Sequence, residues 1–327
     1  MSKTQVSSLN VSKAAYEQLA YFALRSQMLF DQAADVMPTN QSMPGTSVVF
    51  TKFADLSAAT TPLTEDTDVT PVAMSDAQVT VTLFEYGNAV NTTAKLRGTS
   101  FLDVDAAAAN IIGYNAGDSI DQVVREVLSA GTQNIFYGSG GASLPTSRAT
   151  VGSDDIITAN DVRKMTASLR KKNVAPRDGG FYVGFIHPDV SYDLRRETGN
   201  ASWNAPHINV DTVNIYTGEI GTFESVRFIE TPRAKIFEDA SDGSGSSTGG
   251  GATVDVYCTH VMGQQALAKA YSIVDGNGPF PRIIEGPVVD VLRRFNPTGW
   301  HWLGGYGRFR EESLGRIESA SSIGANS

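Results

Sequence analysis

The pattern of apolar and polar positions predicts a helix near the start of the chain. Apolar side chains recur every three or four residues over positions 12–36, which is the spacing of one helix face. Ser26 interrupts this stripe, whose members are Ala15, Leu19, Phe22, Leu29, Ala33 and Val36. Prolines at 38 and 44 end the predicted helix. Such a helix must pack on its own core or on another subunit, and the sequence favours neither.

An extended two-stranded segment is predicted next. Residues 46–53 are rich in Val and Phe, and residues 78–91 begin with apolar and polar side chains in alternation, the period of a β-strand. Between them, residues 57–71 consist mainly of Ala, Ser, Thr, Pro and acidic residues and are nearly devoid of large apolar side chains. Because an isolated two-stranded arm is only marginally stable in water, we expect this arm to pack on a partner surface.

A long helix and a mixed α/β region follow. A stripe from Ile120 to Leu128 lies inside a helix predicted over residues 103–131. Thr158 and Asp161 have the spacing of a capping box for a helix that ends near residue 173. A short helix is predicted over 189–197, and residues 241–251 have the composition of a surface loop. Strands are predicted over residues 181–186, 226–229, 234–237, 254–257, 266–273 and 288–294, and residues 314–318 close the ordered part.

Composition narrows the function classes. The 327 residues are 41% apolar, which is enough for a substantial core. The net charge of −9 repels polyphosphate, so sequence-reading DNA binding is not expected. Cys258 is the single cysteine, which excludes an intrachain disulfide and a cysteine-based zinc site. We see neither a secretory signal nor an apolar run of about 18 residues, so we expect folding in a reducing, aqueous compartment.

The sequence contains no recognisable pattern of catalytic or metal-binding residues. The acidic residues 65–68 lack the spacing of a calcium loop. We interpret His187 as a turn residue ahead of a helix, and Cys258, two residues before His260, as a buried structural thiol. The histidines are too far apart for helical or hairpin metal spacing, at His187, His207, His260 and His301. We therefore expect no catalytic residue, no cofactor and no metal.

Two small-residue loops resemble functional motifs only superficially. The stretch at 138–141 lacks the Gly-Lys-Ser/Thr of a phosphate-binding loop, and its Gly138, Gly140 and Gly141 are interpreted as turn residues with positive φ. The serines of 241–251 lie in a loop too flexible to hold a nucleophile in place.

The order of elements and three short stretches carry a family resemblance. The stretches read Phe-Ile-His-Pro-Asp-Val-Ser-Tyr-Asp-Leu-Arg at 185–195, Gly-Thr-Phe-Glu-Ser-Val-Arg-Phe-Ile-Glu-Thr at 221–231 and Leu-Gly-Arg-Ile-Glu-Ser at 314–319. Over about residues 10–320 the chain resembles the major capsid proteins of tailed bacteriophages, and more narrowly those of N4-like phages. The resemblance implies an α+β fold of the Hong Kong 97 (Johnson) type.

The resemblance also implies a division of the chain. Residues 1–45 look like the N-terminal arm, and residues 46–97 look like the E-loop. Residues 98–157 would contain the spine helix and part of the peripheral domain, and residues 158–287 the axial domain. Residues 288–327 would supply further peripheral-domain strands and a C-terminal tail.

The implied function is closed-shell assembly. Subunits would form hexamers and pentamers of an icosahedral head that encloses the double-stranded DNA genome, with DNA near the wall but not bound by sequence. The implied partners are the portal, a separate scaffolding protein and a cement protein, with no membrane. The protein would be assembled in the host cytoplasm and reside in the virion capsid. Candidate contacts between subunits are Lys52, Phe53, Phe84, Tyr86 and Asn88.

Some of the family's features and some other readings remain open at this point. The Lys–Asn cross-link of the type member cannot be placed, because Lys52, Asn88 and Asn91 match no motif for it. Phe53, Phe84 and Tyr86 could equally pack within their own subunit. The alternative functions are an encapsulin-like compartment shell, a tail-tube protein and, from a different class, an unrecognised hydrolase.

Overall fold

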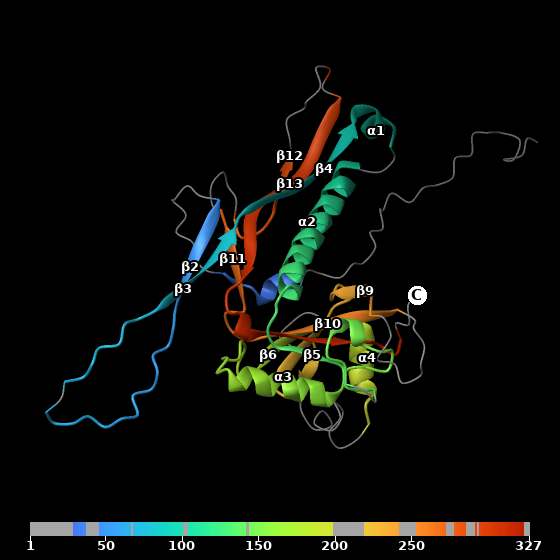
Figure 1. The fold of residues 1–327 in the computed structure, drawn as a ribbon. Coiled ribbons are helices and arrows are strands. Elements are labelled where there is room, and N and C mark those ends of the chain that lie inside the picture. The colour runs from blue at the N-terminus through green and yellow to red at the C-terminus, as the bar shows by residue number, and fades with distance from the viewer. Residues whose placement is uncertain are drawn as a thin grey trace, which may run out of the picture. The chain divides into compact units, whose positions relative to one another are not determined.

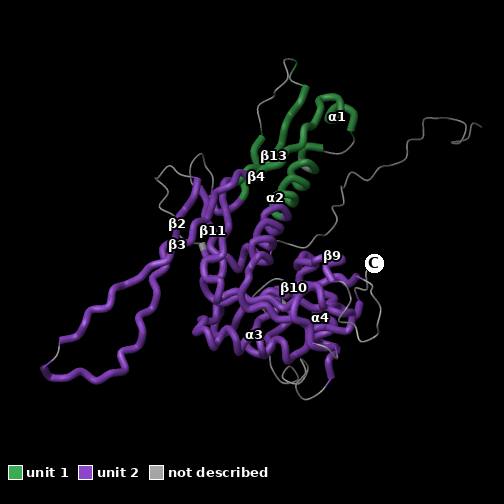
Figure 2. Tube along the Cα trace, viewed as in Figure 1, with its two compact units in different colours: residues 1–25, 86–117, 281–302 green, residues 26–85, 118–280, 303–327 purple. Residues whose placement is uncertain are grey.

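The computed structural model describes residues 29–36, 46–66, 68–100, 104–141, 144–198, 219–241, 253–272, 278–285, 292 and 294–323. They form two compact units, each built from stretches that are distant in sequence (Figure 2). The smaller unit takes its described residues from 86–117 and 281–302, and the larger unit takes the rest. Helix α2 (Val104–Ser129) and strand β13 (Phe295–Arg308) each continue from one unit into the other.

A seven-stranded mixed sheet forms the core of the larger unit (Figure 1). The strand order is β5-β14-β10-β6-β8-β7, with β9 paired to β10. Strand β6 is buried along its whole length, as its continuous apolar sequence predicts. The strands are β5 (Ile135–Tyr137), β6 (Tyr182–Ile186), β7 (Glu219–Phe223), β8 (Val226–Glu230), β9 (Ile236–Ser241), β10 (Val254–Met262) and β14 (Leu314–Ser319).

Two helices pack on this sheet. Helix α3 (Ala159–Lys171) begins with the predicted capping box, in which Thr158 and Asp161 satisfy each other's backbone N–H groups. Helix α4 (Pro188–Arg196) follows β6 after the single residue His187. Both helices bury their apolar faces in one cluster with residues of β6, β8 and β10. Single 3₁₀ turns occur at Arg148–Thr150 and Glu311–Ser313.

The structure corrects the last part of the helix predicted over 12–36. Residues 12–28 lie outside the described residues, and residues 29–36 form a 3₁₀ turn η2 (Phe30–Ala33) and a short strand β1 (Asp35–Val36). The Asp121 carboxylate accepts the N–H groups of Leu29 and Phe30 at 3.2 and 3.0 Å. The Phe30 ring packs on Phe185 with centroids 4.6 Å apart. At residues 29–36 these contacts replace helical hydrogen bonds, so the 3.6-residue period did not decide the conformation there.

The predicted two-stranded arm is present. Strand β2 (Ser47–Phe53) pairs antiparallel with β3 (Asp76–Thr82), from Ser47 opposite Thr82 to Phe53 opposite Asp76. The strand predicted over 78–91 divides at Leu83, after which β4 (Phe84–Thr93) begins. Strand β4 pairs with β13 instead of extending the hairpin.

Among the described residues, the smaller unit combines part of a five-stranded sheet with helices. Strands β4 and β12 (Arg282–Glu285) pair with the first half of β13, and α1 (Ala94–Thr99) follows β4. Asn115 of α2 accepts the indole N–H of Trp300 at 2.9 Å and a hydrogen bond from Asn88 at 3.2 Å. The second half of β13 lies in the larger unit and pairs with β11 (Leu267–Tyr271), which also pairs with β1.

The prediction of a strand over 288–294 is wrong where the structure describes it. Residue 292 is in a turn and residue 294 in no regular element, and the strand is β13, which starts at Phe295. Its glycines hid the strand period. A Cβ at Gly305 would lie 2.1 Å from the carbonyl oxygen of Thr82, and one at Gly299 would lie 2.8 Å from that of Asn88. Glycine is needed here because another backbone approaches closely.

Close approach also corrects the reading of the 138–141 loop. None of its three glycines has a positive φ. A Cβ at Gly138 would lie 2.2 Å from the carbonyl oxygen of Asp155, and one at Gly141 would lie 2.3 Å from the Asp155 carboxylate. The loop therefore packs against the buried Asp155 segment, and its glycines provide space and not unusual dihedral angles.

Candidate assembly surfaces

The segment that joins β2 to β3 exposes large apolar side chains. Residues 54–75 contain no helix or strand among their described positions and are exposed throughout (Figure 1). The exposed fractions run from 55% at Val69 to 76% at Leu63. The apolar members of this arm, counting the last residue of β2, are Phe53, Leu56, Leu63, Val69, Val72 and Met74. Side chains of this size are usually buried, so the arm is incomplete as a folded structure by itself.

The base of the hairpin is anchored, in contrast to its outer part. Val48, Phe50 and Val79 pack against a small core that contains Val81 and Phe309. The rings of Phe50 and Phe309 meet edge to face at 6.3 Å. A surface cavity of about 520 Å³ lies beside this core, lined by Thr51, Lys52, Phe53, Ala54, Asp55, Gln265, Phe309, Arg310 and Glu312.

Three of the predicted contact residues, Phe53, Phe84 and Asn88, are exposed. Phe53 is 64% exposed and Phe84 is 56% exposed, so both can meet another molecule. Lys52 is half-buried and lines the cavity at the hairpin base. The structure thus brings Lys52 and Phe53 to one cavity wall, while Phe84 lies beyond the hairpin at the start of β4.

Two of the predicted residues, Tyr86 and the exposed Asn88, also make contacts within their own unit. The ring of Tyr86 stacks on Trp302 with centroids 6.0 Å apart, and burial raises the pKa of its hydroxyl. The side chain of Asn88 donates to Asn115 and accepts the N–H of Ala89. Packing inside the subunit, which the sequence left open for Tyr86, is what the structure shows at this position.

The smaller unit also exposes apolar side chains that were not predicted. Their exposed fractions run from 38% to 71%. These side chains belong to Val90, Leu96, Ile111, Ile283, Leu292 and Phe295. A shallow cavity of about 510 Å³ in the same unit is lined by Gly87, Asn88, Ala89, Ile284, Pro297, Gly299 and Trp300. The signal in the sequence is weak, because these residues come from five separate helices and strands and one turn and form no continuous pattern.

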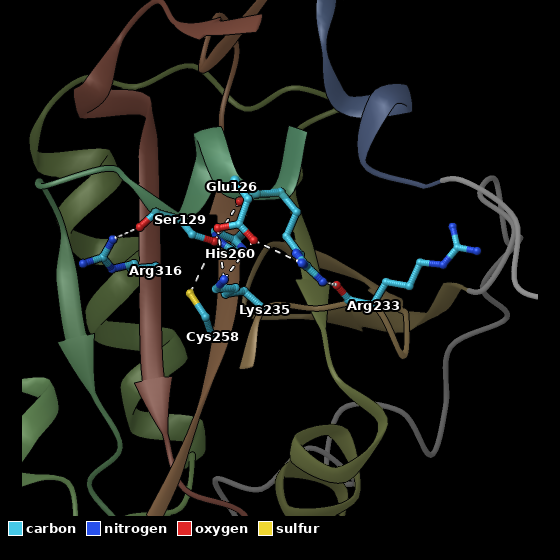
Figure 3. A network of polar contacts seen from close by, with 8 residues as sticks. Glu126, Ser129, Arg233, Lys235, Cys258, His260 and Arg316 are labelled. Carbon is cyan, nitrogen blue, oxygen red and sulfur yellow. Dashed lines mark hydrogen bonds and ion pairs between the residues drawn. The ribbon is translucent and has the colours of Figure 1, made fainter. Parts of the chain in front are cut away.

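A polar cluster inside the larger unit brings together residue types found in catalytic sites (Figure 3). The Nε2 atom of His260 lies 3.2 Å from the hydroxyl of Ser129 and 3.4 Å from the sulfur of Cys258. Arg316 donates to the carbonyl oxygens of Ser129 and Gly131. The sequence placed Cys258 and His260 near each other but gave no sign of Ser129, which comes from the end of α2.

This cluster is closed off from solvent, so a substrate could not reach it and a catalytic role is excluded. His260 is fully buried and Cys258 is 1% exposed. Burial lowers the pKa of His260 to about 3 and raises that of the Cys258 thiol well above its ordinary value. The Nδ1 atom of His260 has no hydrogen-bond partner among the described residues, so no carboxylate orients the ring as in a triad. The thiol is the buried structural group that the sequence predicted.

The turn predicted at His187 is confirmed. His187 is the N-cap of α4, and its Nδ1 atom accepts the N–H of Asp189 at 3.3 Å. Burial lowers its pKa, against the opposing effect of Asp189 and Glu230. Within the part of the chain that the structure describes, no group of three or more His, Cys, Asp or Glu residues is arranged to hold a metal ion. Nor does any described helix have the length and apolarity to cross a membrane.

Comparison with protein families gives a match along almost the entire sequence. The family model described as "Phage capsid protein" matches residues 5–324. The chain belongs to the phage capsid protein family. It is a major capsid protein of a tailed phage, a structural component of the icosahedral head and not an enzyme. This membership sets aside the tail-tube and hydrolase readings and places the capsid protein in the virion.

Solved structures agree on the fold of the capsid protein. The capsid of Ralstonia phage GP4 is 14% identical, with a TM-score of 0.74 over 96% of each chain. The capsid of cyanophage Pam1 is 16% identical, with a TM-score of 0.70 over 95% of this chain and 97% of that one. The head protein of Helicobacter pylori bacteriophage KHP40 is 11% identical, with a TM-score of 0.70 over 98% and 99%. The Hong Kong 97-type α+β fold is therefore confirmed. No curated protein matches the sequence.

Proposed function

We propose that the capsid protein assembles into hexamers and pentamers in which the arm at residues 53–75 lies on a neighbouring subunit. The apolar exposure of that arm carries the proposal. Full burial of each large apolar side chain would contribute about 1.5–3 kcal/mol, and the subunit itself leaves six of them uncovered. Many such contacts, repeated around a closed shell, would resist the internal pressure of a packaged double-stranded DNA genome.

The parts of the chain have natural counterparts in this scheme. The β2–β3 hairpin and its arm correspond to the E-loop, α2 to the spine helix, the smaller unit to the peripheral domain, and the seven-stranded sheet with α3 and α4 to the axial domain. The exposed apolar side chains of the smaller unit would meet further copies. A portal, a separate scaffolding protein and a cement protein are the additional partners we propose, with assembly taking place in the host cytoplasm.

The role of the arm is tested by replacing two of its exposed apolar residues with aspartate. We expect Leu63→Asp with Val72→Asp to leave the thermal unfolding of the dissociated subunit unchanged, because both side chains are at least 69% exposed. The same variant should fail to form capsomer rings or shells, since assembly would bury two charges against an apolar surface. Sedimentation and negative-stain microscopy measure this, with the protein alone and with a co-expressed scaffold candidate.

Leu144→Asp provides the matched control. Leu144 is 67% exposed but lies outside the arm, so its variant should assemble like the wild type. Shells formed normally by the arm variant would contradict the proposed role of the arm. A wild-type protein that stays monomeric under all these conditions would contradict self-assembly in this form altogether.

A further inference from the structure

Helix α3 has a charge opposite to that of the protein around it. Over residues 159–172 there are five Lys and Arg against the single acidic residue Asp161, a net charge of +4, whereas the whole chain carries −9. The cationic residues fall in two groups near the two ends of the helix and are Arg163, Lys164, Arg170, Lys171 and Lys172.

The geometry of α3 directs these charges outward. Its buried face, which includes Val162, Met165 and Leu169, packs in the core of the larger unit, where α3 contacts β5 and β14 (Figure 1). Lys164 and Lys171 are exposed and seven residues apart, so they lie on the same side of the helix, about 10 Å apart along its axis. Charges at such intervals along a straight rod can each meet a phosphate of duplex DNA, which carries about one charge per 1.7 Å.

Ion pairs within the subunit neutralise only part of this charge. Arg163 pairs with Glu224 at 2.8 Å, and Lys164 lies 3.3 Å from the buried carboxylate of Asp161. At the other end, Arg170 and Lys172 contact the uncharged Ser225 and Gln133. The negative end of the helix dipole favours cations in the last turn, which is a structural reason for some of them. It does not account for Arg163 and Lys164, which lie near the positive end.

The surroundings of the cations suit a polyanion better than a protein. Protein interfaces are centred on buried apolar or aromatic side chains, whereas DNA interfaces are polar and strongly basic. No large apolar side chain is highly exposed anywhere from residue 145 to residue 191, a stretch that the structure describes completely. The exposed positions between the cations are small or polar, as at Asn160 and Ala167.

We propose that the outward face of α3, residues 160–172, contacts the phosphate backbone of the packaged double-stranded DNA without reading its sequence. The inference rests on the proposed function, because it requires a shell that encloses a genome. It also places this face of α3 on the inner wall. An otherwise acidic wall would keep DNA from adhering broadly, while one basic helix per subunit would hold the outermost layer weakly and at regular intervals.

The experiment measures binding of a labelled 30-base-pair duplex to the full-length protein, kept unassembled by dilution, over a series of salt concentrations. For Lys164→Gln, Arg170→Gln and Lys171→Gln combined, we expect affinity at least tenfold lower at about 50 mM salt. The plot of log affinity against log salt should become less steep by about 2–3, since each lost phosphate contact removes about 0.9. All three residues are exposed, and glutamine is a good helix former.

The matched control removes the same charge elsewhere, through Lys95→Gln, Arg282→Gln and Arg294→Gln, at three other exposed cations. It should bind DNA like the wild type. Equal weakening in both variants, or no binding by the wild type, would overturn the proposal. So would normal DNA binding by the α3 variant together with lost assembly on a scaffold, which would make α3 a protein-docking face. Shell formation is followed separately by microscopy, so a failure of assembly is not mistaken for a failure of DNA binding.

Discussion

Individual glycines determine how closely separate backbone segments pack in this subunit. At Gly138, Gly299 and Gly305, a Cβ would lie within 3 Å of a carbonyl oxygen of another segment. The requirement is for space, since none of these three glycines has a positive φ. A sequence shows the glycine but not the neighbouring backbone, which is why a turn with positive φ was the natural and incorrect interpretation of the 138–141 loop.

We expect Gly138→Ala to destabilise the subunit by about 1–3 kcal/mol, because the new methyl group would lie 2.2 Å from the Asp155 carbonyl oxygen. Gly98→Ala is the control, since a Cβ there meets nothing within 4 Å. In helix α1 that change should stabilise slightly. Urea denaturation of the dissociated protein measures both. Equal midpoints for the two variants would show that the loop can move aside.

His260 should make stability depend on pH. Its pKa is about 3 in the folded protein and near 6.5 when unfolded, because burial disfavours the charged ring. Between these values the unfolded chain binds a proton that the folded chain does not. The free energy of unfolding should therefore fall as the pH is lowered from 6.5 toward 3, by up to about 1.4 kcal/mol per pH unit.

Denaturation of the wild type and of His260→Asn at several pH values from 7.5 to 4.5 tests this. The dependence should be shallower in the variant. If the variant does not fold, NMR titration of the wild-type ring is the alternative measurement, and titration above about pH 5.5 would contradict the assignment.

At the scale of elements, the apolar pattern of the sequence predicted those helices and strands whose position depends on burying apolar side chains in the core. Helix α2 was predicted over 103–131 and spans Val104–Ser129, and α3 and β6 also lie where their patterns placed them. The strands β5 and β12 were missed, because three or four residues are too few to show a period, and β7 was missed as well. The exposed arm could be recognised from its composition. The intrachain contacts of Tyr86 and Asn88 could not, since both depend on residues more than 25 positions away.

The segment at 29–36 gives a prediction at this scale. The Asp121 carboxylate accepts hydrogen bonds from the N–H groups of Leu29 and Phe30, the first two residues of this segment. Asp121→Ala should leave these N–H groups without an acceptor and make the segment more mobile. We expect at least tenfold faster hydrogen exchange in peptides that cover residues 29–36. Asp118→Ala is the control, because Asp118 also pairs with Arg233 but is not the acceptor for Leu29 or Phe30. Equal exchange in the two variants would show that Phe30 packing alone holds the segment.

At the scale of the whole molecule, folding and assembly should be linked. A subunit that buries its arm only on a neighbour is more stable in the shell than alone. Only folded subunits associate, so assembly shifts the folding equilibrium toward the folded state. Calorimetry should therefore show a melting temperature several degrees higher for assembled wild-type protein than for dissociated subunits. The Leu63→Asp, Val72→Asp variant should melt at the dissociated temperature at every concentration, and concentration-independent melting of the wild type would contradict the linkage.

The pairing of β2 and β3 has a consequence for the life of a newly made subunit. In the described part of the chain these two strands pair only with each other, so each has an outer edge of unmatched N–H and C=O groups. Such edges recruit strands from any chain, including the wrong one. Lys52, Asp55 and Asp76 put charges at the outer end of the hairpin, where they would discourage stacking of one hairpin on another. The yield of correct heads then depends on whether a new subunit binds its proper neighbours before its hairpin edges pair with a wrong chain and aggregate. Slow, dilute expression should favour correct binding to neighbours.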